Sequence, residues 1–219
     1  MPRMKTLRKP RAIVWDLDGT LLDTIPLINV CHNVVASAFG RPQRSVTESK
    51  NLTALAPEVI MAELAGAENV AAARELYVQE YAAKHLEYLA TCDGAGDMLA
   101  AIHAAGIVQS INTSKRRSFM EPEIAQLGWG AYFKVTVCPG EAPKNKPDPA
   151  SFVHCCMLMG IEPGVDVWMI GDTAADVDCG IGGGGSTVLV SADVYEGKEP
   201  TLQCRDLREL AAVFANLKD

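Results

Sequence analysis

Ala12-Ile-Val-Trp-Asp-Leu-Asp-Gly-Thr20 is the stretch that decides the fold of this 219-residue chain. Within it, Ile13-Val-Trp15 is rich in β-branched and aromatic side chains, which is typical of a short strand. The run ends at Asp16-Leu-Asp18-Gly19, a turn signal. Alternation along an extended chain places Asp16 and Asp18 on the same side, and Gly19 lets the backbone turn sharply after them. The stretch therefore predicts a strand that delivers two carboxylates at its carboxyl end.

Beyond residue 93, strands alternate with helices. Further strands are predicted over 107–112, 134–138, 166–170 and 187–190, and helices over 95–105, 117–127, 149–159 and 206–217. Such alternation is typical of a parallel sheet that is covered by helices on both faces. We therefore predict an α/β fold whose core is a Rossmann-like parallel sheet.

Residues 26–90 interrupt this alternation, because they contain no convincing strand. Helical patterns occur over 26–39, 57–66 and 68–90, and a polar loop with helix-start residues covers 40–50. The first strand is thus separated from the others by a helical block. We predict a core of residues 1–23 and 93–219 and an inserted helical domain of residues 24–92.

Composition and charge disfavour several classes of protein. A net charge of −7 and a pI near 5.1 disfavour a broad nucleic-acid surface. The chain has no apolar run that approaches the roughly 18 residues needed to cross a bilayer. Seven cysteines without a CxxC pair provide no zinc-finger or thioredoxin-like framework. We expect a cytoplasmic monomer or homodimer that binds neither nucleic acid nor membrane.

Chemically active side chains follow several of the predicted strands. In an open parallel sheet, ligands bind beyond the carboxyl ends of the strands. The second strand ends in Asn112-Thr113-Ser114-Lys115, the third leads to Lys144 and Lys146, and the fourth ends in Gly171-Asp172-Thr-Ala-Ala-Asp176. Three or four converging carboxylates repel one another unless a cation neutralises them, and oxygen ligands favour Mg²⁺. We expect Mg²⁺ there and, with Lys146, attraction of a phosphoryl group.

Four ordered motifs carry a resemblance to a known family. Asp16-x-Asp18-Gly-Thr20-Leu-Leu-Asp23-Thr24, then Thr113, then Lys146-Pro-Asp-Pro, then Gly171-Asp172-x-x-x-Asp176 resemble the motifs of haloacid dehalogenase-like hydrolases. The likeness runs from Ala12 to about Val190. The helical insert resembles the cap of the phosphoglycolate phosphatase and phosphoglucomutase-like subgroup.

This resemblance implies a role for each matching residue. Asp16 would be the nucleophile that forms an aspartyl-phosphate, and Asp18 would protonate the leaving alcohol and then activate water. The carboxylates of Asp16 and Asp172 and the backbone carbonyl of Asp18 would hold Mg²⁺. The other implied members contact the phosphoryl group or support the site: Thr113, Lys146, Asp176, Thr20 and Gly19.

The resemblance leaves several functions open. Asp18 favours phosphate esters, because dehalogenases of this fold lack an acid at that place. The first expectation is a Mg²⁺-dependent phosphatase acting on a small phosphorylated metabolite, with phosphoglycolate as the leading substrate. The alternatives are a phosphosugar mutase and a non-catalytic descendant that binds a phosphorylated ligand or a protein partner.

Two details depend on weaker signals. The choice of Lys146 over Lys144 rests only on the Lys-Pro-Asp-Pro resemblance. The run Gly180-Ile-Gly-Gly-Gly-Gly185 replaces an alanine-rich helix end that is usual in the subgroup, and we interpret it as a flexible loop.

Overall fold

A computed structural model describes residues 8–217, and the chain divides into two compact units. One unit contains the residues up to Leu22 and from Thr91 onward, and the other contains Asp23–Ala90. The helical insert was predicted over 24–92, and the bounds of the second unit differ from these by one residue at the start and two at the end. The outer limits of the predicted core, residues 1 and 219, lie outside the described residues.

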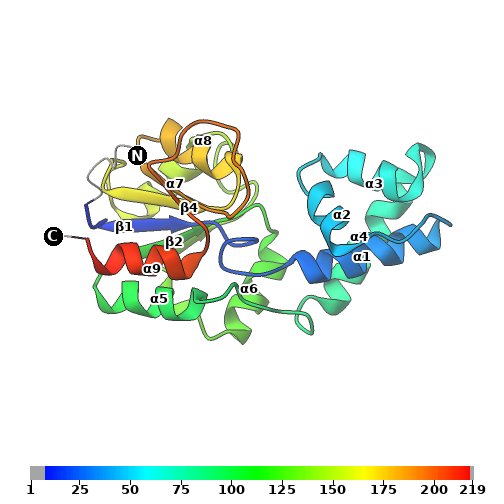
Figure 1. Cartoon of the computed structure of the whole chain (residues 1–219), viewed down its shortest axis with the longest axis horizontal. Coiled ribbons are helices and arrows are strands. Elements are labelled where there is room, and N and C mark those ends of the chain that lie inside the picture. Colours follow the sequence, from blue (N-terminus) through cyan, green and yellow to red (C-terminus); the bar gives the residue numbers. More distant parts are fainter. Residues whose placement is uncertain (1–7, 218–219) are drawn as a thin grey trace. The chain divides into compact units, whose positions relative to one another are not determined.

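A parallel sheet forms the centre of the first unit (Figure 1). Its order among the described residues is β3-β2-β1-β4-β5-β6, and each neighbouring pair is parallel. The strands are β1 (Ala12–Trp15), β2 (Val108–Asn112), β3 (Val135–Val137), β4 (Val167–Gly171), β5 (Ser186–Val190) and β6 (Leu202–Cys204). The strand order reverses between β1 and β4, and such a reversal opens a ligand crevice beyond the carboxyl ends of those two strands.

Helices cover both faces of this sheet, as predicted (Figure 1). Helices α7 (Ala150–Met159) and α8 (Ala174–Gly182) pack against one face, where α7 contacts β2 and β3 and α8 contacts β4 and β5. Helices α5 (Ala95–Ala104) and α9 (Leu207–Ala215) pack together on the other. The remaining segments are α6 (Arg117–Gln126) and the short 3₁₀ turn η2 (Gly130–Tyr132).

Strand β1 is fully buried because it lies between two strands and two helical layers. Its four residues have no exposed surface, and Trp15 is in register with Ile111 of β2 and Ile170 of β4. The buried indole N–H of Trp15 donates to Gln109 Oε1 over 3.0 Å, which satisfies its polar group. The register of this buried run therefore sets the position at the carboxyl edge of the sheet where Asp16 lies.

The glycine run after residue 180 packs closely against its neighbours. Gly180 and Gly182 belong to α8, so the interpretation of this stretch as a flexible loop is wrong there. A Cβ atom on Gly183 or Gly185 would lie 2.4 or 2.5 Å from ring atoms of Phe152 in α7. Only a residue without a side chain lets the chain pass this ring, and that requirement explains Gly183 and Gly185.

All regular elements of the second unit, within the residues that the structure describes, are helices. It contains α1 (Ile25–Ala38), α2 (Val46–Leu52), α3 (Pro57–Ala65), the 3₁₀ turn η1 (Ala67–Asn69) and α4 (Val70–Lys84). Helices α1, α3 and α4 share a small apolar core of Val35, Ala36, Met61, Leu64, Ala65 and Ala73. This unit therefore has a core of its own, as a separate domain requires.

Three helices and strands of the structure were not predicted: α2, α8 and β6. The polar segment 40–50 contains the start of α2, because Ser45 and Glu48 form a reciprocal capping box. Strand β6 has only three residues and lies at the edge of the sheet, so it has little pattern to detect. Within residues 8–217, no helix has the length and apolar character that crossing a membrane requires.

Candidate active site

The predicted site residues of β1 and β4 meet at the strand-order reversal. Asp16 directly follows β1, and its N–H donates to the carbonyl of Ile170 over 2.8 Å. Asp172 directly follows β4, and Asp176 lies in the first turn of α8. The parallel register therefore brings residues that are far apart in sequence to the same edge of the sheet.

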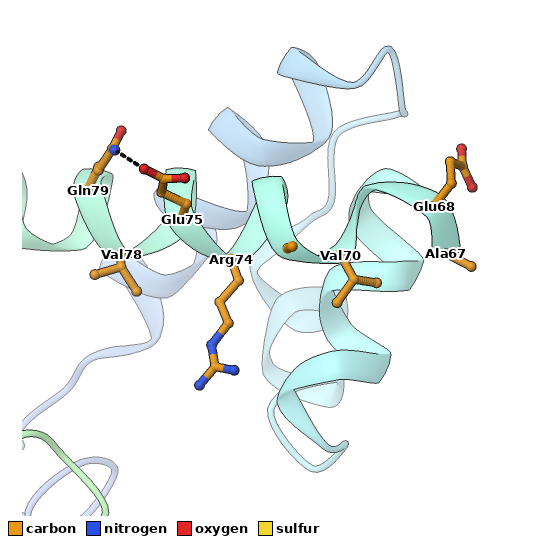
Figure 2. Close-up of a pocket in the computed structure, with 8 residues that line it drawn as sticks. Ala67, Glu68, Val70, Arg74, Glu75, Val78 and Gln79 are labelled. Carbon is orange, nitrogen blue, oxygen red and sulfur yellow. Dashed lines mark hydrogen bonds between the residues drawn. The ribbon is translucent and has the colours of Figure 1, made fainter.

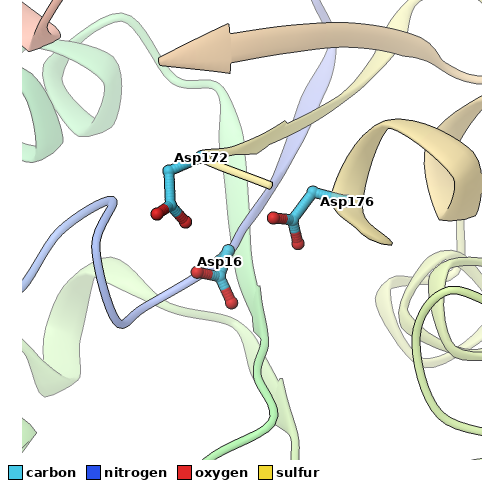
Figure 3. A group of neighbouring side chains, drawn as sticks. All are labelled: Asp16, Asp172 and Asp176. Carbon is cyan, nitrogen blue, oxygen red and sulfur yellow. The ribbon is translucent and has the colours of Figure 1, made fainter. Parts of the chain in front are cut away.

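Three carboxylates converge at this edge (Figure 3). One carboxylate oxygen each from Asp16, Asp172 and Asp176 lies within 4.8 Å of the others, and Asp16 and Asp176 are buried. Two glycines leave room for them. A Cβ atom on Gly19, whose φ is +83°, would lie 2.3 Å from Asp172 Oδ2, and one on Gly171 would lie 2.2 Å from Asp176 Cγ. The glycine of each motif is thus required by the neighbouring carboxylate.

Lys146, and not Lys144, enters the acidic cluster. Its ammonium forms an ion pair with Asp16 Oδ1 and another of 2.7 Å with Asp176 Oδ1, and its side chain is 5% exposed. Lys144 is 73% exposed and pairs with Asp148. The geometry therefore separates the two lysines that follow the third strand.

The hydrogen bonds of the cluster distinguish its three carboxylates. Asp176 Oδ2 accepts from the backbone N–H and the hydroxyl of Thr173, so both Asp176 oxygens have protein donors once Lys146 is counted. The Thr20 hydroxyl lies 3.4 Å from Asp16 Oδ2 and 3.3 Å from Asp172 Oδ1, and its single proton serves only one of them at a time. Asp16 and Asp172 therefore keep acceptor capacity that Asp176 has already used.

The acidic cluster holds more carboxylates than ammonium groups. Burial raises the pKa of Asp16, Lys146 opposes this shift, and Asp176 and Asp172 add to it, which gives a pKa of about 8. Burial and the charge of Asp176 raise the pKa of Asp172 to about 6. One ammonium thus does not balance three carboxylates. The donor set fits a divalent cation, because oxygen ligands suit Mg²⁺ and a second positive centre would keep both carboxylates ionised.

Asp18 and Thr113 occupy the two neighbouring turns. Asp18 Oδ1 lies 2.6 Å from the ammonium of Lys115, which also forms an ion pair with Glu123 of α6. Thr113 follows β2 and accepts a hydrogen bond from the backbone N–H of Lys115 at its hydroxyl oxygen, over 3.0 Å. A hydroxyl that accepts in this way still has its own proton to donate.

Lys115 and Glu123 were absent from the predicted site. Lys115 belongs to the polar run at the end of β2, so its position was a usable signal. Glu123 offered none, because a glutamate on a helix is ordinarily solvated, whereas this side chain is 1% exposed.

A separate hollow of about 710 Å³ lies in the helical unit, along η1 and α4 (Figure 2). Its polar side chains pair locally, since Gln79 donates to Glu75 and Arg74 pairs with Glu58. Volume without convergent polar groups is weak evidence for a site. We therefore assign the candidate site to the acidic cluster. The hollow is lined by Ala67, Glu68, Val70, Ala71, Arg74, Glu75, Val78 and Gln79.

The sequence pattern of residues 13–190 matches the family described as haloacid dehalogenase-like hydrolase. The chain belongs to this family. That match covers both units and all four motifs, so the resemblance predicted from the motifs is confirmed.

Curated relatives support the enzyme class. The chain is 31% identical over 191 residues to N-acetylmuramic acid 6-phosphate phosphatase of Pseudomonas aeruginosa, covering 85% of this chain and 84% of that protein. It is 29% identical to phosphoglycolate phosphatase of Pseudomonas fluorescens, covering 92% and 78%. The prediction of a phosphoric monoester hydrolase of this family is confirmed at the level of the enzyme class.

Solved structures support the fold. A hydrolase of the same superfamily from Ehrlichia chaffeensis is similar with a TM-score of 0.68 at 21% identity, covering 96% of this chain and 98% of that one. CbbY from Rhodobacter sphaeroides, in complex with phosphate, is similar with a TM-score of 0.75 at 18% identity, covering 92% and 96%. The predicted α/β architecture is therefore confirmed.

Proposed function

We propose that the protein is a Mg²⁺-dependent phosphatase that hydrolyses a small phosphorylated metabolite through an aspartyl-phosphate on Asp16. The convergence of Asp16, Asp172 and Lys146 beyond β1 and β4 carries this proposal. A buried carboxylate beside an ammonium, with a second carboxylate in reach, supplies both a nucleophile and the means to neutralise a phosphoryl dianion.

The residues divide the work as follows. Lys146 holds one oxygen of Asp16 by its ion pair, which orients the carboxylate for in-line attack on phosphorus. Asp16 and Asp172, with the backbone carbonyl of Asp18, would hold Mg²⁺, whose charge neutralises phosphoryl oxygens when it is bound. Asp18 gives a proton to the leaving oxygen and then takes one from the attacking water. Thr113 donates its hydroxyl proton to a phosphoryl oxygen.

The substrate we propose is a phosphate monoester that also carries a carboxylate. The two curated relatives are named for phosphoglycolate and for N-acetylmuramic acid 6-phosphate, and both compounds have these two groups. Phosphoglycolate is the first substrate to test. The helical unit Asp23–Ala90 is proposed to act as a cap that contributes selectivity and excludes bulk water.

The test is phosphate release from a panel that contains phosphoglycolate, N-acetylmuramic acid 6-phosphate, hexose phosphates and p-nitrophenyl phosphate. We expect release with Mg²⁺, loss on chelation, and loss in Asp16→Asn. Asp178→Asn is the matched control, because Asp178 is a partly exposed aspartate that pairs with Lys198. Release by Asp16→Asn at the wild-type rate would contradict the proposal. Interconversion of hexose phosphate isomers without phosphate release would indicate a mutase.

A further inference from the structure

A buried chain of charges connects helix α6 to the acid proposed for catalysis. Lys115 Nζ lies 2.6 Å from Asp18 Oδ1 and forms an ion pair with Glu123 Oε2. The side chains of Lys115 and Glu123 are 4% and 1% exposed, whereas that of Asp18 is 33% exposed. The side chains of Lys115 and Glu123 therefore form a buried support, and Asp18 is the one of the three that is accessible to solvent.

Stability alone is a poor explanation for this arrangement. Transferring an ammonium and a carboxylate out of water costs several kcal/mol per ion, and their attraction often does no more than offset that cost. A buried ion pair is therefore weak evidence of a stabilising role. Glu123 retains the ammonium, so Lys115 cannot swing away from the turn that carries Asp18.

We propose that Lys115, anchored by Glu123, is a positioning residue that sets the orientation of the Asp18 carboxylate. This inference rests on the proposed function, in which Asp18 exchanges protons with the leaving oxygen and with water. Holding one carboxylate oxygen of Asp18 at Lys115 directs the other oxygen away from that contact. The backbone N–H of Lys115 also donates to the Thr113 hydroxyl, so one residue orients both the acid and the proposed phosphoryl donor.

Leaving-group dependence separates this role from a merely structural one. Asp18 matters most when the leaving oxygen is a poor one, as in phosphoglycolate, and least for p-nitrophenolate, which departs without full protonation. Lys115→Met should therefore lower kcat/KM for phosphoglycolate by about 10²-fold, the size expected when a catalytic group is misplaced by about 1 Å. The loss with p-nitrophenyl phosphate should be several-fold smaller. A general loss of folded protein would lower both equally.

A double-mutant cycle provides the decisive comparison. In an Asp18→Asn background, Lys115→Met should have little further effect on kcat/KM, because it acts through the missing carboxylate. Lys115→Met removes the ammonium that faces the buried Glu123 carboxylate, so Lys115→Met/Glu123→Gln removes that negative charge as well and should show the same ratio between substrates. Lys144→Met is the control for loss of a lysine and should retain wild-type rates, because Lys144 is 73% exposed.

The outcomes distinguish this inference from the function on which it rests. A wild-type protein that releases no phosphate from any substrate removes the proposed function and this inference together. An active wild type whose Lys115→Met variant keeps its rates overturns the inference alone. The inference would also be overturned if Lys115→Met lowered kcat/KM equally for both substrates and this loss multiplied with that of Asp18→Asn. That result would place Lys115 on the phosphoryl group.

Discussion

Replacing Gly19 by alanine should displace the Asp172 carboxylate and slow phosphate release. The new Cβ atom would lie 2.3 Å from Asp172 Oδ2, whereas ordinary contacts begin near 3.4 Å. The carboxylate or the turn must therefore move by about 1 Å. A misplacement of that size costs about 10²-fold in rate, which corresponds to about 2.7 kcal/mol in activation free energy. Because Asp172 is a proposed Mg²⁺ ligand, the Mg²⁺ concentration for half-maximal activity should also rise.

Backbone strain must be separated from this contact. The φ of Gly19 is +83°, and an L-residue in that region costs about 1–2 kcal/mol of stability. Gly106→Ala is the matched control, because Gly106 has a φ of +72° and nothing lies within 4 Å of the Cβ position. Gly19→Ala should lose at least as much free energy of unfolding in urea as Gly106→Ala, and only Gly19→Ala should lose kcat and apparent Mg²⁺ affinity. Equal rates for the two alanine variants would refute the reasoning.

Three further predictions concern charge, pH and packing. Lys146→Met should lower the free energy of unfolding by about 3–5 kcal/mol, because it leaves Asp16 and Asp176 without their buried cation, while Lys144→Met should change it by less than about 0.5 kcal/mol in the same urea titration. Burial, with a smaller effect from Arg44, lowers the pKa of His32 to about 4, so the unfolded chain binds the extra proton and stability falls as the pH drops from about 6.5 towards 4. The wild type should therefore lose up to about 3 kcal/mol relative to His32→Gln across that window, and parallel stability profiles would contradict this. Gly185→Ala should cost about 1–3 kcal/mol through overlap with Phe152, measured against Gly130→Ala, whose Cβ would meet nothing within 4 Å.

Much of the fold could be predicted because its signals are local. The apolar run before Asp16 and the alternation of strands with helices beyond residue 93 identify a parallel sheet, and the helical block identifies the insert. Elements of only a few residues, or elements that begin in a polar segment, were harder to detect from the sequence. Helix α2 begins inside a polar segment at a Ser45–Glu48 capping box, and β6 is a three-residue edge strand.

The candidate site was predictable where a residue directly follows a strand. Asp16, Thr113 and Asp172 occupy such positions, so their placement follows from the topology rule for parallel sheets. The choice of Lys146 over Lys144 rested only on the Lys-Pro-Asp-Pro resemblance, because both lysines lie in one loop and the topology rule does not separate them. Glu123 could not be found from the sequence, since no local pattern shows that α6 packs with this side chain inward, against the ammonium of Lys115 eight residues earlier.

A tertiary contact also explains part of the glycine run, and such a contact is not visible in the sequence. The φ of +81° at Gly184 is a local reason for glycine, but no local feature explains Gly183 or Gly185, and the composition of the run favoured a loop. The reason lies in α7, where the ring of Phe152 occupies the space that side chains on Gly183 and Gly185 would need.

The most direct test of the central claim is the mass of the protein during turnover. Asp18→Asn, mixed with p-nitrophenyl phosphate and Mg²⁺ and quenched in acid, should carry one phosphoryl group, because the good leaving group allows attack while the lost base slows hydrolysis. Peptide mapping should place that group on Asp16, and Asp16→Asn/Asp18→Asn should carry none. A phosphoryl group on another residue, or turnover by wild-type enzyme with no phosphorylated form in either protein, would contradict the assignment of Asp16 as nucleophile.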